Sequence, residues 1–260
     1  MRNILILYII FSSTTLISQI SINKNAINVS IDNGITLLLS NKEPNPTTIL
    51  ALRYINDNFL EKNDSITKYI KQHINKVQSN DEVISFMRLI MSGNFFIEKK
   101  RSLFDRLTLN AMYCDMLPVS DDFINKLDYY SDSGDIYMIT HCALALQFLH
   151  ENNCFSFDNK EYKELHTKLS NKMSEFLDST EFVLDPYVES VMMLFYIGSG
   201  NYVCENYIQK IINVQLPDGG WSKYKSENYC ISNDHTTVLA IWALCAYRNK
   251  GVAKINWIVK

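Results

Sequence analysis

One segment near the C-terminal end restricts the possible folds more than any other part of the chain. Residues 215–221 read QLPDGGW, and residues 234–244 read DHTTVLAIWAL. Two adjacent glycines allow backbone angles that end a helix, and Trp221 can pack over the resulting turn. The side chain of Gln215 can bond the exposed backbone groups of a helix end. The segment therefore predicts two helices joined by a fixed turn, the second of them strongly apolar.

The rest of the chain repeats this pattern of helical segments separated by turn residues. Segments 136–149, 187–197 and 236–247 are apolar on nearly all sides, whereas 159–178 and 201–214 are apolar on one side. A helix that is apolar all round is surrounded by protein, and a one-sided helix faces solvent. We therefore expect an all-α domain over residues 46–260, without strands, in which inner and outer helices alternate. The pattern fits an incomplete barrel of about five helical hairpins, and a solenoid of stacked hairpins gives a similar one.

Capping residues mark several of the expected helix starts. Asn159 precedes a polar helical segment, Asp185-Pro186 opens an apolar one, and Asn80-Asp81 is placed to cap a helix that runs to Met91. Residues 22–43 show slight alternation of polarity but no clear element. The sequence therefore predicts an N-terminal arm over residues 21–45, ahead of the helical domain.

Residues 1–20 combine one positive charge at Arg2 with a short, almost uncharged apolar stretch. This pattern is typical of a secretory signal peptide, and the stretch is short for a membrane span of about 20 residues. We expect a secreted or periplasmic protein, with an uncleaved N-terminal membrane anchor as the alternative. Export permits disulfides, but the chain has six cysteines, so their pairing stays open. Cys142 and Cys245 lie in apolar segments and are expected in the core.

The motif formed by Gln215 and Asp218-Gly219-Gly220-Trp221 resembles the Gln/Trp repeat of triterpene cyclases. Followed by His235-Thr236, the motif also resembles the final hairpins of protein prenyltransferase β subunits. Both families belong to the α/α-toroid group. The resemblance implies a ring of helical hairpins whose inner helices direct their N-termini toward a central cavity. It covers one hairpin well and residues 134–250 more weakly.

The chain departs from both families at the residues that carry their chemistry. Class II cyclases have an Asp-x-Asp-Asp acid motif, which this sequence lacks. Prenyltransferases bind zinc through an Asp-x-Cys unit and a later histidine; His235 stands where that histidine would be, but no Asp-x-Cys precedes it. The sequence therefore predicts no metal and no cofactor. The resemblance is stronger for architecture, through the structural residues Gln215, Gly219, Gly220 and Trp221, than for a reaction.

A weak internal repeat points to one group of polar residues. Segment 140–146 aligns with segment 235–241 at an offset of 95 residues, which brings His141 and His235 within one residue of equivalent positions. Helix N-termini of a repeated fold would then face the same end of the barrel. The candidates for a pocket are Asp135, His141, Asp185, Glu189, Asp234 and His235. Helix capping is the alternative role for Asp135 and Asp234, and a core position is the alternative for each histidine.

These candidates favour an exported domain that binds a ligand or a partner in a central or end-on pocket, with catalysis unproven. The expected occupants are a small molecule, a glycan or a protein. One alternative is a carbohydrate-active hydrolase or lyase that uses carboxylates and histidine at the barrel rim. Another is a terpene- or prenyl-handling enzyme without the usual acid and zinc motifs. Nucleic acid is not an expected partner, because the net charge is −3 and no basic stripe is present.

Overall fold

The computed structural model describes residues 22–97, 100–120, 122–155, 159–225, 231–251 and 253–260, and these residues contain helices but no strand. The prediction of an all-helical fold is therefore confirmed for the described part of the chain. The α-helices are α1 (Lys24–Ser40), α2 (Pro46–Phe59), α3 (Asp64–Gln78), α4 (Leu103–Met112), α5 (Phe123–Ser131), α6 (Ile136–Glu151), α7 (Lys160–Ser179), α8 (Asp185–Tyr196), α9 (Glu205–Asn213) and α10 (Asp234–Arg248). Two short 3-10 helices are η1 (Ile84–Leu89) and η2 (Gly200–Tyr202).

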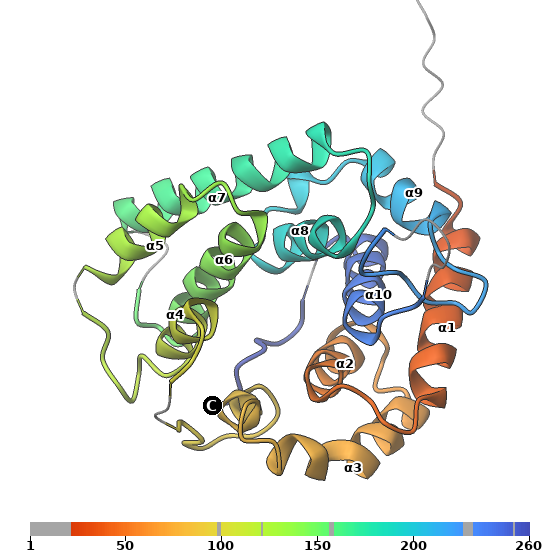
Figure 1. Ribbon diagram of the computed structural model, residues 1–260, viewed down its shortest axis with the longest axis horizontal. Helices are drawn as coiled ribbons and strands as arrows, with labels where there is room; N and C mark the ends of the chain where they lie inside the picture. The colour runs from red at the N-terminus through yellow and green to blue at the C-terminus, as the bar shows by residue number, and fades with distance from the viewer. Residues whose placement is uncertain (1–21, 98–99, 121, 156–158, 226–230, 252) are drawn as a thin grey trace, which may run out of the picture.

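Inner and outer helices alternate along the chain (Figure 1). The inner ring consists of α2, α4, α6, α8 and α10, and the helices outside it are α1, α3, α5, α7 and α9. Neighbouring inner helices pack directly on one another from α4 through α6, α8 and α10 to α2, while η1 contacts both α2 and α4. Helices α6, α8 and α10, which are apolar on nearly all sides, are thus surrounded by protein, as their composition requires.

The structure corrects the expectation of an N-terminal arm over residues 21–45, because most of that segment forms helix α1. The side chain of Asn23 caps the helix by accepting from the backbone N–H of Asn25. The buried residues Ile27, Ile31 and Leu38 form one stripe that packs on α10. This stripe is narrow and is interrupted by small and polar residues, so the sequence pattern resembled weak alternation more than a helix.

Residues 80–91 also differ from expectation. A helix was expected from the cap at Asn80-Asp81 to Met91, whereas the structure has only the 3-10 helix η1. Arg88 on η1 is 1% exposed and donates to the backbone oxygen of Met112 and to the carboxylate of Asp115. Burial of this side chain ties η1 to the end of α4, and this tertiary contact takes precedence over continued α-helix.

The turn at residues 215–221 holds α9, α10 and α1 together. Gln215 Nε2 donates to the backbone oxygens of Ser30 and Gly219, each at 2.8 Å. Trp221 Nε1 donates to the backbone oxygen of Ile211 at the end of α9, also at 2.8 Å. Gly219 has φ of 94°, and a Cβ atom there would lie 2.7 Å from the backbone oxygen of Asn33 on α1. The turn therefore closes its own hairpin and also receives α1.

Cys114 and Cys154 form a disulfide across the ends of α4 and α6, two helices that pack on each other. Cys142 and Cys245 are free and fully buried, as expected for small core residues, and Cys204 is free and exposed. Cys230 and the proposed signal peptide lie outside the described residues. None of the helices in the described part of the chain has the length and apolar character needed to cross a membrane.

The C-terminal residues 253–260 return into the ring of inner helices (Figure 1). Trp257 is 8% exposed and packs against the rings of Tyr54, Phe148 and Trp242. Glu151 anchors this tail, because its Oε2 accepts from the backbone N–H of Ile258 at 2.9 Å. Its Oε1 accepts from the hydroxyl of Tyr196 at 2.8 Å. Trp257 and Ile258 of the tail thereby become part of the core.

Burial raises the pKa of Glu151 above its ordinary value of 4.5, so stability is expected to depend on pH through this residue. Between 4.5 and the raised pKa the folded state binds more protons than the unfolded state, so the unfolding free energy falls as pH rises. Glu151→Gln keeps an acceptor for Ile258 but has no proton to lose. The wild type should lose about 1.4 kcal/mol relative to this variant per unit of raised pKa. Urea denaturation of both proteins from pH 4.5 to neutral pH measures the difference, and parallel stability curves would rule out this role.

Candidate functional site

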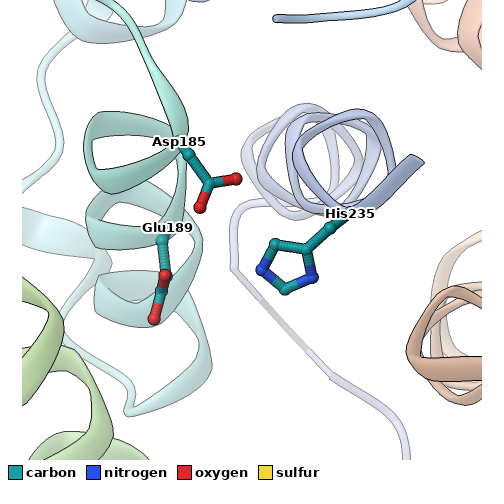
Figure 2. A group of neighbouring side chains, drawn as sticks. All are labelled: Asp185, Glu189 and His235. Carbon is teal, nitrogen blue, oxygen red and sulfur yellow. The ribbon is translucent and has the colours of Figure 1, made fainter. Parts of the chain in front are cut away.

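Two buried carboxyl groups lie on one face of α8 at the end where that helix begins. Asp185 is the first residue of α8, and Glu189 follows one turn later. Their side chains are almost entirely removed from solvent, with 1% and 6% exposure. His235, the second residue of α10, reaches toward them from the neighbouring inner helix (Figure 2). One oxygen or nitrogen atom from each of the three side chains lies within 4.8 Å of the other two.

Hydroxyl groups from the two flanking helices hold the carboxylates in place. Tyr137 on α6 donates to Asp185 Oδ2 at 3.1 Å, and Thr236 on α10 donates to Asp185 Oδ1. Thr140 on α6 donates to Glu189 Oε1 at 2.6 Å. Burial and the negative charge of Asp185 raise the pKa of Tyr137, so its hydroxyl stays protonated as a donor. These bonds join the N-terminal turns of α6, α8 and α10, so the three helices run in the same direction.

His141 lies beside this group on α6. Its Nδ1 is 2.8 Å from the backbone oxygen of Tyr137 and 3.7 Å from Glu189 Oε1. A carbonyl oxygen only accepts, so Nδ1 carries the proton in the neutral ring and Nε2 is left as an acceptor. The imidazole also packs against Phe104, with ring centroids 4.9 Å apart. A neutral His141 is therefore oriented as a proton acceptor, which is the form suited to general-base work.

A cavity of about 320 Å³ opens at this end of the inner ring, and both His141 and His235 line it. Residues from the first turns of α2 and α4 line it as well, so the inner helices meet here with their N-terminal ends. Trp257 of the C-terminal tail is part of its wall. The remaining apolar lining residues are Leu50, Ala51, Val83, Phe86, Leu89, Leu144, Phe148, Val238 and Leu239. The polar lining residues are Thr47, Glu82, Asp105, Thr108, His141 and His235. A mostly apolar cavity with some polar groups is the usual form of a small-molecule site.

The structure brings together four of the six residues that the sequence singled out: His141, Asp185, Glu189 and His235. It places the other two elsewhere. Asp135 is exposed and caps α6 by accepting from the backbone N–H of Tyr137. Asp234 accepts from Asn41 Nδ2 at 2.6 Å, on the side of α10 that faces away from the cluster, and the cap of α10 is Asn233. Neither aspartate lines the cavity, and both make these bonds at helix ends.

The sequence patterns did not indicate a role for the hydroxyl donors Tyr137, Thr140 and Thr236. Thr140 and Thr236 have matching roles, since each lies in the first turns of an inner helix and donates to a carboxylate on α8. A one-residue shift of the internal repeat would have aligned these two threonines instead of pairing Thr140 with His235. The contribution of Trp257 to the cavity wall had no signal in the sequence, because it depends on where the tail returns.

Comparison of this chain with protein-family models, with curated proteins and with solved structures found no match in any of the three.

Proposed function

We propose that this protein is an exported α/α-toroid domain that binds a small amphipathic molecule at the N-terminal end of its inner helices. The alternation of inner and outer helices supports the toroid class, as does the resemblance of the turn at 215–221 to the repeats of that group. The observation that carries the binding function is the cavity of about 320 Å³ shared by His141 and His235. Its polar lining residues suit a head group and its apolar wall suits a hydrocarbon or aromatic body.

The disulfide supports the proposal of export. Cytosolic thiols are kept reduced, whereas disulfides persist in secreted and periplasmic proteins. The pair Cys114–Cys154 joins two helices that already pack closely, so its formation requires little rearrangement. Together with the apolar stretch after Arg2, this bridge favours an extracytoplasmic location over a cytosolic one.

The carbohydrate-active alternative is less well supported. Glycoside hydrolysis uses two carboxyl groups on opposite sides of the bond that is cleaved. Asp185 and Glu189 instead project from one face of α8 and accept hydrogen bonds from hydroxyl groups of α6 and α10. Neither lines the cavity, where the carboxyl groups are those of Glu82 and Asp105. A terpene or prenyl compound falls within the proposed ligand class, because Phe86, Phe148 and Trp257 give the cavity an aromatic wall.

An uncharged fluorescent probe, N-phenyl-1-naphthylamine, tests the cavity directly. Its fluorescence should rise to saturation on titration with the wild-type protein, with about one site per chain. Leu144→Trp places a larger side chain in the cavity and should weaken binding by at least about tenfold, roughly 1.4 kcal/mol. Val214→Trp, at a position that is 38% exposed and outside the cavity, is the matched control and should bind as the wild type does. Equal affinity in both variants would show that the probe binds elsewhere, and the cavity proposal would then fail.

A further inference from the structure

We propose that Asp185, Glu189 and His235 bind a first-row divalent cation of the zinc type. The proposal deepens the function proposed above, because one of the three ligands, His235, also lines the cavity. The residues that carry it are the two carboxyl groups on α8 and the imidazole on α10, whose ligand atoms lie within 4.8 Å of one another (Figure 2). The sequence had predicted no metal, because the expected Asp-x-Cys unit is absent.

The charge of the two buried carboxyl groups favours a bound cation. Asp185 and Glu189 are 1% and 6% exposed, and a buried carboxylate is costly unless it is paired. Within the described part of the chain, no lysine or arginine forms an ion pair with either group, and His141 approaches Glu189 only to 3.7 Å. The hydroxyl donors and the N-terminus of α8 supply partial charges. A divalent cation would balance the two negative charges completely.

The hydrogen-bond donors around the carboxylates also favour a metal site. Metal-binding carboxylates are commonly held by a second layer of hydrogen bonds that fixes their orientation. Here Tyr137, Thr140 and Thr236 supply such a layer from two helices. His235 faces the two carboxylates from α10, with its ring turned toward α8 (Figure 2). A bound zinc ion would require each of the three ligand atoms at about 2.0–2.2 Å from the ion.

The burial of the site and the types of its ligands restrict the kind of cation. Magnesium keeps several water molecules and calcium takes six to eight oxygen ligands, which a site this buried does not offer. An imidazole nitrogen with two carboxylate oxygens suits zinc and its first-row neighbours. Three protein ligands leave a fourth tetrahedral position open. Because His235 also lines the cavity, that open position can accept the polar head of a bound molecule.

Zinc alone, without any organic ligand, is the probe for this site. The full chain is treated with a chelator, dialysed and titrated with Zn²⁺ by calorimetry. We expect one ion per chain for the wild type and at least about tenfold weaker binding for Glu189→Gln and Asp185→Asn. Asp234→Asn removes the same charge from a carboxylate outside the cluster and should bind zinc as the wild type does. Co²⁺ should give the intense visible bands of a four-coordinate site in the wild type and Asp234→Asn only.

Two further measurements distinguish loss of the zinc site from loss of folding or of the cavity. Glu189→Gln removes a buried charge, so in chelator its thermal midpoint should be no lower than that of the wild type, and added Zn²⁺ should raise only the wild-type midpoint. Wild-type protein that binds no zinc, or variants that bind it with unchanged affinity, would overturn the cation site. Binding of the naphthylamine probe in chelator distinguishes the two proposals, because it reports on the cavity alone.

Discussion

Trp221→Ala is expected to lower the unfolding free energy by about 3–5 kcal/mol, because it removes a large, fully buried aromatic side chain. Trp221 is 1% exposed and lies where α1, α9 and α10 meet. Its ring also fits tightly against α1, since a Cβ atom on Gly34 would lie 3.0 Å from it. The alanine variant would therefore leave a cavity at this junction and an unpaired backbone oxygen at Ile211. Urea denaturation followed by far-ultraviolet circular dichroism gives the free-energy difference.

Trp221→Phe separates the two parts of this effect. The phenylalanine ring retains most of the apolar contact but has no N–H to donate to Ile211, so we expect a loss of about 1–3 kcal/mol. The backbone N–H of Trp221 still donates to Thr237 Oγ1 in both variants. An alanine variant that loses less than about 1 kcal/mol would behave like an ordinary surface substitution, and the turn would then not hold the helices together.

Replacing both bridged cysteines, as Cys114→Ala with Cys154→Ala, is expected to lower the unfolding free energy by about 4 kcal/mol. The bridge spans 40 residues, and in the chain-entropy description a closed loop of this length restricts the unfolded chain by about that amount. The packing of α4 on α6 remains in the variant, so the fold itself should persist. Chemical denaturation of the oxidised wild type and of the double variant measures the difference.

A reductant provides the control for this experiment. Reduction should lower the stability of the wild type to nearly that of the double variant, and it should leave the double variant unchanged. Cys142→Ala is a useful third protein, because its thiol is free and buried in α6 and the bridge remains intact. If the wild type is unaffected by reductant, the two thiols are not bridged in solution, and the support for export would be withdrawn.

Much of the helical framework could be predicted because its signals are local. Asn159 caps α7 through its side chain, as expected. Asp185-Pro186 opens α8 where expected, but the N-cap is Leu184 and the Asp185 side chain makes no cap hydrogen bond. Helix α1 was missed because its buried stripe is narrow and includes Gly34, which the structure uses for close approach to α10. Segment 80–91 was overpredicted because the burial of Arg88 favours a short 3-10 helix there. Both errors arise where a contact between distant residues outweighs local preference.

At the candidate site, too, some features could be predicted from the sequence and others depended on contacts between distant residues. His141 and His235 were linked by the internal repeat, and both line one cavity. The repeat also favoured Asp135 and Asp234, which the structure assigns to capping and to a bond with Asn41. Asp185 and Glu189 have the central position instead. Their importance depends on the rotation of α8, which places both on the face directed at α6 and α10.

By itself the sequence determined where most helices begin and end, and which of them are surrounded by protein. Caps, turn residues and apolar periodicity act within a few residues, so they can be read along the chain. Only the tertiary structure decided which polar side chains meet. Asp234 and His235 are neighbours in sequence, yet successive side chains on a helix point about 100° apart. Helix rotation therefore directs Asp234 toward Asn41 and His235 toward the buried carboxylates and the cavity.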